Sequence, residues 1–400
     1  MSFKFGLEAL LQDKKLLAEL KKKRVSLVCH PASVDQNLNH SIDLLYKKIN
    51  LVSGFGPQHG VKGEKQYNMM ESADEVHPVY KIPIFSLYGE HRRPTKPMMD
   101  TFDVVVFDLQ DVGCRIYTFI TTLLYVMEEC AKYGKKVIVL DRPNPIGREI
   151  EGLSLVSGQE SFVGAAPIPM RHGLTMGEIA LFFKDHFKLD LELKIVKMKG
   201  YSPTKKYGYG WPDLVSWVNP SPNAPNLNMA RVYPGTVYLE GTWLTEGRGT
   251  TRPLEVVGHP DMDFGQILQR MKKIAPQWLK GALIRECYFE PTFYKHQAKT
   301  CHGLQIHTDN KSYNPKTFKP VRLFALMFKA VRLEYPKFDL YRDFSYEYVH
   351  DRLAFDVING GPALREWIED AKAKPAALEK AMKRDEQAWA TKSRKYYLYK

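Results

Sequence analysis

Cysteines are few in this sequence, and their spacing matches no metal site or disulfide framework. The chain has 400 residues and five cysteines, an odd number with no C-x-x-C pair. Without such spacing, neither a zinc knuckle nor a set of disulfides is expected. We therefore expect reduced thiols in a cytoplasmic protein.

Long apolar runs are also missing. None approaches the roughly 18 residues of a membrane-spanning helix. Residues 1–24 have apolar side chains at helical spacing, but no continuous apolar core and no small-residue cleavage site of a signal peptide. The sequence predicts no membrane span and favours an intracellular location.

Catalytic and cofactor motifs that depend on a fixed spacing are absent as well. The sequence has no G-x-S-x-G, which argues against a serine hydrolase, and no H-E-x-x-H or carboxylate cluster at metal-binding spacing. In GFGPQHG, Gly60 comes one residue too late for the G-x-G-x-x-G turn that binds a dinucleotide. We expect no metal and no cofactor, and a tight bend that presents Gln58 and His59.

Positive charge predominates. Lys and Arg number 58 against 45 Asp and Glu, giving a net charge of +13 and a pI near 9.2. Such an excess attracts anionic partners or substrates. The basic residues are scattered, apart from KKKR at 21–24 and the C-terminal end, and neither run has the pattern of an RNA-binding motif. We expect a solvated basic surface and no nucleic-acid partner.

Strand-like and helix-like segments alternate through the first half of the chain. Helical patterns cover 116–134 and 175–187, where Thr175 and Glu178 have the spacing of a capping box. Apolar runs that predict buried strands are RVSLVCH, INLVSGF, KIPIFSLYG, FDVVVFDLQD, KKVIVLDRPNP and LDLELKIVKM. This alternation predicts an α/β fold, with a Rossmann-like N-terminal domain and a mostly parallel sheet.

The pattern changes after about residue 200. Loops rich in Gly, Pro and aromatic residues lead into mixed short strands and helices. Because single cores stop growing at roughly 250 to 300 residues, a chain of this length favours two domains. We expect a Rossmann-like domain over 1–232 with the active-site cleft and a smaller α+β auxiliary domain over 233–400.

Polar side chains fall where the predicted parallel strands end. In such sheets the ligand crevice lies beyond the carboxyl ends of the strands. Turn chemistry alone explains any single one of these residues more readily, but five strand ends of this kind favour a shared site. The residues are Cys29, His30, Gln58, His59, Glu90, His91, Arg92, Asp108, Asp111, Arg115, Asp141, Arg142 and Asn144.

Several strings resemble one known family. They are GLEALL, FGPQHG, SLYGEHRRPT, VVFDLQDVGCRIYTF, VLDRPNPIG, FVGAAPIPMRHGLTMGEIA, NPSPNAPN and VYPGTVYLEGTWLTEGRGTTRP. Together they are similar to the NamZ-like exo-β-N-acetylmuramidases, long known only as a domain of unknown function. The resemblance implies a Rossmann-like domain that holds the cleft, and removal of N-acetylmuramic acid from the non-reducing end of peptidoglycan fragments without a metal or a nucleotide.

The resemblance also implies a glutamate that this sequence lacks. The family's usual turn reads PEHG, whose glutamate is a proposed catalytic residue, and Gln58 stands at that position. Glycoside hydrolysis normally uses two carboxyl groups. We expect Glu90 to be the general acid, and Glu71 or Asp111 to activate water or stabilise the oxocarbenium ion.

The sugar-binding candidates are polar or basic residues on the same loops. His59 and His172 are expected to bond sugar hydroxyls or orient a carboxylate. Arg115 and Arg142 are expected to pair with the lactyl carboxylate of muramic acid. The remaining candidates are Gln58, His91, Asn144, Asn223, Glu246 and Arg248. For the Glu–Arg pairs of EGTWLTEGRGTTRP, an interdomain brace is an equal alternative.

Two other functions stay open on the sequence alone. The chain could be a non-catalytic muropeptide or amino-sugar binding protein that Gln58 has silenced, or a glycosidase for another anionic amino sugar. Tight binding without turnover favours the first, and activity on other amino-sugar glycosides favours the second.

Overall fold

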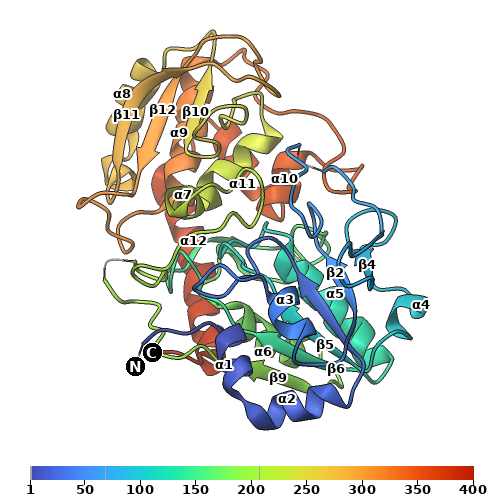
Figure 1. Ribbon diagram of the computed structural model, residues 1–400. Helices are drawn as coiled ribbons and strands as arrows, with labels where there is room; N and C mark the ends of the chain where they lie inside the picture. Colours follow the sequence, from blue (N-terminus) through green and yellow to red (C-terminus); the bar gives the residue numbers. More distant parts are fainter. Residues whose placement is uncertain (1, 68, 207) are drawn as a thin grey trace.

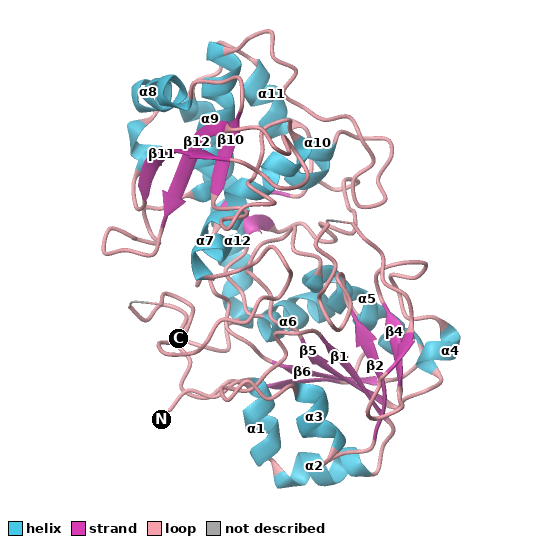
Figure 2. Cartoon of the chain, turned by 45° about the horizontal axis from the view of Figure 1, so that its top comes forward, coloured by secondary structure: helices cyan, strands magenta, loops and turns pink. Residues whose placement is uncertain are grey.

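The chain folds into two parts stacked on one another (Figures 1 and 2). The computed structural model describes residues 2–67, 69–206 and 208–400. The N-terminal part contains a seven-stranded, mostly parallel sheet, and the C-terminal part a three-stranded antiparallel sheet with helices. The predicted α/β class with a smaller mixed C-terminal part is therefore confirmed.

The large sheet has the strand order β3-β4-β2-β1-β5-β6-β9. Its neighbours pair in parallel except β3, which runs antiparallel to β4. β1 and β5 are buried along their whole length, as their continuous apolar sequences require. The strands are β1 (Val25–Cys29), β2 (Leu51–Gly56), β3 (Glu75–Val76), β4 (Pro83–Ser86), β5 (Val104–Asp108), β6 (Lys136–Leu140) and β9 (Leu193–Val196).

Helices cover both faces of this sheet. Helices α1, α2 and α3 lie on one face, and α5 and α6 on the other (Figure 2). The predicted capping box is present at the start of α6, where Thr175 Oγ1 accepts from the Glu178 amide and the Glu178 carboxylate accepts from the Thr175 amide. The helices are α1 (Gly6–Gln12), α2 (Lys14–Lys21), α3 (Ser41–Tyr46), α4 (Lys96–Met99), α5 (Phe119–Lys132) and α6 (Met176–His186), and a small hairpin is formed by β7 (Glu151–Ser154) and β8 (Pro169–Arg171).

The C-terminal part is built around the sheet β10-β12-β11. Helix α9 packs against both α7 and α8. The strands are β10 (Val256–His259), β11 (Leu283–Phe289) and β12 (Cys301–His307). The helices are α7 (Leu227–Thr236), α8 (Phe264–Ile274), α9 (Pro320–Glu334), α10 (Ala354–Asn359), α11 (Ala363–Glu369) and α12 (Pro375–Ser393), with 3-10 turns η1 (Val237–Gly241), η2 (Pro276–Leu279) and η3 (Arg394–Tyr396).

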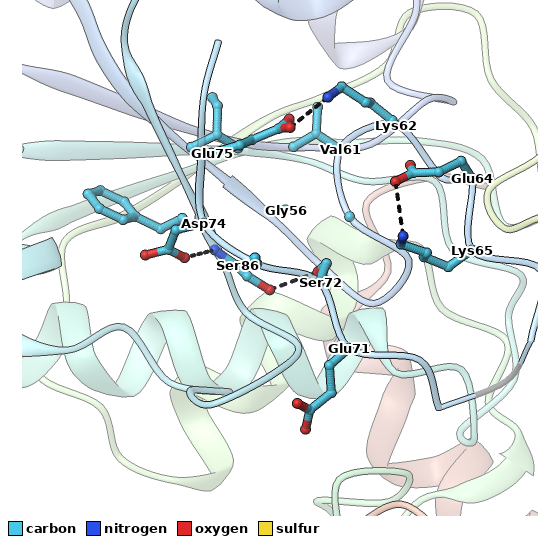
Figure 3. A pocket seen from close by; sticks show the side chains of 14 residues that line it. Gly56, Val61, Lys62, Glu64, Lys65, Glu71, Ser72, Asp74, Glu75 and Ser86 are labelled. Atoms are coloured by element: carbon cyan, nitrogen blue, oxygen red, sulfur yellow. Dashed lines mark hydrogen bonds and ion pairs between the residues drawn. The ribbon is translucent and has the colours of Figure 1, made fainter.

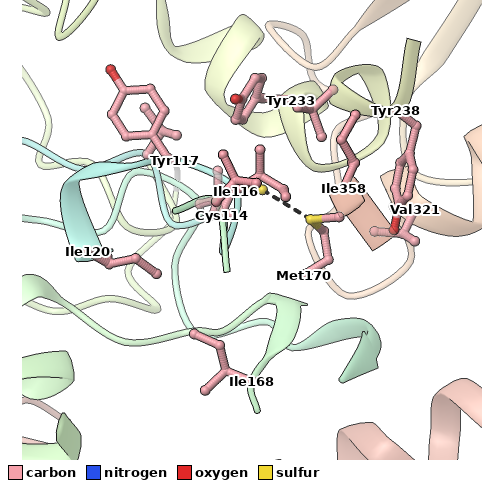
Figure 4. Packing of buried hydrophobic residues seen from close by; sticks show 14 of the residues in the cluster. Cys114, Ile116, Tyr117, Ile120, Ile168, Met170, Tyr233, Tyr238, Val321 and Ile358 are labelled. Atoms are coloured by element: carbon pink, nitrogen blue, oxygen red, sulfur yellow. Dashed lines mark hydrogen bonds between the residues drawn. The ribbon is translucent and has the colours of Figure 1, made fainter. Parts of the chain in front are cut away.

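The two parts share one hydrophobic core. Helix α12 returns from the C-terminal part and packs along β7. A single buried cluster contains Cys114 and Met170 from the N-terminal part and Tyr233, Val321 and Ile358 from the other (Figure 4). Because this contact is continuous and apolar, it fixes the two parts against each other and positions the loops between them.

Candidate active site

A small closed pocket lies where the loops after β2 and before α5 meet the C-terminal part. Its free volume is about 40 Å³, room for a few water molecules at most. Most of its lining is polar or aromatic. The lining residues are Gln58, His59, Ile116, Tyr117, Thr118, Val163, Ser221, Asn223, Met229, Tyr233, Glu240, Arg248, Leu254, Tyr346 and Glu347.

Gln58 enters this pocket from the end of β2 and is buried. Its Nε2 donates to Glu347 Oε1 at 3.1 Å, and its Oε1 accepts from Thr118 Oγ1 at 2.8 Å. The amide is therefore bonded on both sides, to its own domain and to the C-terminal part.

Glu347 is a buried carboxyl at the tip of a tight turn. The Tyr346 and Val349 backbones bond each other in both directions, and the two residues between them, Glu347 and Tyr348, have φ of 46° and 67°. Two positive φ angles are typical of a type I′ turn, which usually takes Asn or Gly. Burial raises the pKa of Glu347 to about 7, and the carboxylate of Glu240 adds to this rise.

The Glu347 carboxyl accepts a second hydrogen bond from the opposite wall. Tyr88 Oη donates to Glu347 Oε2 at 2.9 Å. Both hydrogen bonds, from Tyr88 and from Gln58, favour the charged form and oppose the rise in the pKa of Glu347. Each carboxyl oxygen thus has one fixed partner.

A second buried carboxylate, Glu240, has a different environment. Arg248 Nη2 donates to Glu240 Oε1 at 2.7 Å, and Tyr346 Oη donates to Oε2 at 2.7 Å. Arg248 Nε also bonds Glu246 at 3.1 Å, and Lys295 Nζ lies 2.6 Å from the other oxygen of Glu246. Although burial disfavours its charge, Lys295 and Arg248 hold the pKa of Glu246 below its usual value. One end of the pocket is therefore an ion-pair network.

His59 has a strained backbone and a neutral ring. Its φ is 71°, a left-handed conformation that is uncommon for a residue other than glycine. Its Nδ1 lies 3.1 Å from the Lys65 carbonyl. Burial lowers the pKa of His59 to about 4, and the charge of Arg248 contributes. Strained residues of this kind cluster at functional sites.

Residues 65–67 and 69–71 lie beside the pocket and contact the C-terminal part. The Gln66 carbonyl accepts from Asn223 Nδ2 at 2.9 Å, and the Tyr67 ring packs against Phe293 of the C-terminal part. Met69 Sδ lies 3.3 Å from the Glu347 amide nitrogen. The free volume of the pocket is much smaller than a sugar ring.

Two wider grooves lie near these residues. One has about 460 Å³ of free volume, and Figure 3 shows the Ser72 and Asp74 side chains bonded to Ser86 within it. The other, of about 870 Å³, contains Glu90 and His91. Glu71 borders both grooves.

The structure places the expected catalytic carboxyls outside the pocket. The Glu90 side chain is 89% exposed and 3.5 Å from His91 Nε2. Glu71 accepts from Tyr348 Oη at 3.1 Å, so it lies on the outer side of the turn that carries Glu347. Asp111 Oδ2 accepts from the Gly113 amide at 2.6 Å and fixes a turn after β5.

Four other expected binding residues stabilise the fold instead of lining the pocket. Arg142 bonds Asp108 through two nitrogen atoms, at 2.6 and 3.0 Å. Asn144 bonds the Leu174 carbonyl at 3.0 Å. His172 Nδ1 accepts from the Leu174 amide at 3.2 Å. The fourth is Arg115, whose guanidinium donates to the carbonyls of Leu153, Ile168, Ile358 and Asn359.

Of the expected site residues, the pocket brings together Gln58, His59, Asn223 and Arg248, with Glu246 directly behind Arg248. Sequence reasoning missed Glu347, Tyr346 and Tyr88 as site residues. No spacing rule connects Glu347 to Gln58. The only local signal was an acidic residue between two tyrosines in SYEYVH, which is typical of many surface turns.

Comparison with known proteins decides the family. Residues 25–228 match the N-terminal domain of exo-β-N-acetylmuramidase NamZ, and residues 231–399 match its C-terminal domain. The chain belongs to the NamZ family. The two matched regions meet in α7, close to the predicted boundary near residue 232.

Relatives of the chain span nearly its whole length. It is 36% identical to the peptidoglycan β-N-acetylmuramidase NamZ of Bacillus subtilis (strain 168), over 98% of this chain and 90% of that protein. A crystal structure of a DUF1343 family protein from Bacteroides fragilis NCTC 9343 has 30% identity and a TM-score of 0.84, covering 100% and 99% of the two chains. A second protein of that family and strain has 26% identity and a TM-score of 0.74, with the same coverage.

Metal-binding clusters and membrane-spanning helices are both absent from the described residues. Among them, no group of three or more His, Cys, Asp or Glu side chains is arranged to hold a metal ion. No helix in the same residues has the length and apolar character needed to cross a bilayer.

Proposed function

We propose that this NamZ family member hydrolyses the bond that joins a terminal N-acetylmuramic acid to the rest of a peptidoglycan fragment. One observation carries the proposal: two carboxyl groups, Glu240 and Glu347, line a single pocket in unlike environments. Glycosidases need two carboxyl groups flanking the scissile bond. When the surroundings of two such groups give them different pKa values, one group can act as the acid and the other as the base or nucleophile.

A cation beside the pocket supports an anionic substrate. The Arg92 guanidinium lies 3.6 Å from the centre of the Tyr348 ring. Tyr348 directly follows Glu347 in the chain. Among the described residues, no carboxylate forms an ion pair with Arg92. Muramic acid has a lactyl carboxylate, and Arg binds carboxylates through two parallel hydrogen bonds. Arg92 is therefore our candidate for recognising that group.

We also propose that the reaction takes place in the cytoplasm, on fragments recovered from the cell wall. The five cysteines are free and buried, which suits a reducing compartment. Cell fractionation with an antibody to the protein tests this placement, and its recovery from the periplasm or the medium would refute it.

The decisive test uses the disaccharide in which N-acetylmuramic acid is linked to the 4-hydroxyl of N-acetylglucosamine. We expect release of free N-acetylmuramic acid from it, and none from the disaccharide with the two sugars in the reverse order. Tight binding without release would indicate a binding protein. Turnover confined to other p-nitrophenyl amino-sugar glycosides would indicate another substrate.

Arg92→Gln tests the recognition of the anion. We expect kcat/KM for p-nitrophenyl N-acetylmuraminide to fall at least tenfold, chiefly through KM. Arg92→Lys should recover part of the loss because it restores the charge without the planar pair of donors. Equal effects on muraminide and glucosaminide substrates would contradict this role.

A further inference from the structure

We propose that Glu347 is the general acid of the pocket, and that Gln58 is a positioning residue that holds its carboxyl without titrating. This assignment rests on the glycosidase function proposed above. It places the proton donor on a turn in the C-terminal part and not at the end of β2.

Backbone geometry supports a dedicated role for Glu347. It occupies the first central position of the Tyr346–Val349 turn with φ of 46°, where a side chain longer than Asn is strained. Tertiary contacts hold it there, since its carboxyl is bonded by Gln58 and Tyr88. Strain maintained at a buried acidic residue indicates function more than stability, because an Asn or Gly would make the same turn at lower cost.

The amide of Gln58 suits both states of an acid. With Nε2 facing Glu347 it donates to the carboxylate, while Oε1 accepts from Thr118. Rotated by half a turn, Oε1 accepts from the carboxylic acid and Nε2 donates to the Thr118 hydroxyl, which serves as either partner. Gln58 therefore supports Glu347 before and after proton transfer.

The surroundings of the two carboxyls fit opposite tasks. Burial raises the pKa of Glu347 to about 7, so a large part of it is protonated at neutral pH. Glu240 instead receives hydrogen bonds from Arg248 and from Tyr346. A general acid works best with a pKa near the operating pH, and a neighbour bonded to a cation suits stabilisation of positive charge on the sugar.

The step balances with one water molecule. The Glu347 proton moves to the glycosidic oxygen as the bond from C1 to that oxygen breaks, and the leaving sugar departs as an alcohol. The oxygen of water forms the new bond to C1, and a proton of that water restores the acid. No oxidant, reductant or metal is required.

The first experiment removes the acid without changing its shape. Glu347→Gln should lower kcat/KM for the disaccharide roughly 10²- to 10⁴-fold. A p-nitrophenyl leaving group needs no protonation, so the same variant should lose far less activity on p-nitrophenyl N-acetylmuraminide. Glu366→Gln, the same change at an exposed residue of α11, is the matched control and should behave like the parent.

The second experiment tests Gln58. Gln58→Glu places a carboxyl beside Glu347, and two adjacent carboxyls cannot both ionise easily. We expect the alkaline limb of the pH profile of kcat/KM to move up by at least one pH unit. Gln58→Ala should lower kcat and move the limb up by less than Gln58→Glu does, because a hydrogen bond to the carboxylate is lost but no charge is added.

The third measurement does not depend on turnover. Burial raises the pKa of both Glu347 and Asp141 to about 7. Infrared difference spectra recorded between pH 5 and 8 should therefore show protonated carboxyl absorption that disappears with a midpoint near 7, and Glu347→Gln should lose part of this absorption while the part from Asp141 remains. Absorption of unchanged size in the variant would assign all of it to other residues and would overturn the proposal.

The outcomes separate the two claims. A parent protein that turns over no muramyl substrate refutes the proposed function. A parent that is active, with Glu347→Gln unimpaired or impaired equally on both leaving groups, refutes the role of Glu347 alone. Activity gained in Gln58→Glu from an almost inactive parent would make Gln58 a disarmed catalytic position, and loss of turnover only in Glu90→Gln would assign the acid to Glu90.

Discussion

Gln58 Nε2 donates to Glu347 Oε1 across 3.1 Å, although 289 positions separate the two residues in the chain. The bond joins the end of β2 to a turn in the C-terminal part. A glutamine at position 58 therefore does not leave the pocket without a titratable carboxyl. The pocket is complete only when both parts of the chain are packed together.

Removal of the buried Glu347 carboxyl should change how stability depends on pH. Its pKa is about 7 in the folded protein against a reference value of 4.5, so the folded state binds more protons between these values. Stability from this group is present below about pH 4.5 and is lost as pH rises through about 7. Glu347→Gln should remove this loss and raise the free energy of unfolding by up to about 3 kcal/mol at pH 8.

Urea denaturation of the parent and of Glu347→Gln at pH 5 and pH 8 measures this effect. Glu366→Gln should track the parent at both values, since its side chain is exposed. A stability difference between parent and Glu347→Gln that does not grow with pH would show that the carboxyl is not protonated in the folded state.

The fold could be predicted because its signals are local. The six apolar runs became strands of one sheet, and Thr175 and Glu178 formed the capping box that their spacing indicated. Burial on both faces requires continuous apolar sequences, and a cap requires partners three residues apart. Both features can be recognised from a few consecutive residues of the sequence.

The site was only half predictable because half of it is not local. Gln58 and His59 directly follow a strand, so the predicted end of that strand was enough to identify them as candidates. Glu347 reaches the pocket through the packing of α7, α9 and the shared core, which no short pattern records. Strand-end residues such as Arg142 were expected to bind substrate. The guanidinium of Arg142 instead forms a buried ion pair with Asp108.

Arg115 should prove to be a brace between the two parts. It is fully buried, and its guanidinium donates to the carbonyls of Leu153 and Ile168 in the N-terminal part and of Ile358 and Asn359 at the end of α10. The single amino group of a lysine in Arg115→Lys cannot bond the carbonyls of both parts at once. Each unsatisfied buried carbonyl costs about 1–3 kcal/mol. We expect the free energy of unfolding to fall by about 3 kcal/mol or more.

Hydrogen exchange gives the more specific readout for Arg115. Amides of α10 should exchange faster in Arg115→Lys, while those of β1 remain protected. Arg93→Lys is the control, since Arg93 forms an exposed pair with Glu128 and such pairs contribute little. Unchanged protection of α10 would mean that the shared apolar core alone holds the two parts together.

The C-terminus should contribute to stability through Tyr399. Its hydroxyl donates to Asp141 Oδ2 at 2.7 Å and accepts from the Met198 amide at 3.0 Å. Tyr399→Phe leaves both partners short of a bond, and we expect a loss of about 1–3 kcal/mol in denaturant unfolding. Tyr397→Phe, at a partly exposed ring, should cost much less. Equal losses in the two variants would contradict a specific role for the Asp141 contact.

His59 should trade stability for activity, because its backbone is strained at φ of 71°. A left-handed conformation costs a residue with a Cβ about 1–2 kcal/mol, and glycine adopts it freely. His59→Gly and His59→Ala both remove the ring from the pocket, so both should reduce kcat/KM. They should differ in thermal unfolding, however, with His59→Gly more stable than His59→Ala by about 1 kcal/mol. A glycine variant less stable than the alanine variant would show that the backbone is relaxed and that the ring contacts alone place His59 beside the substrate.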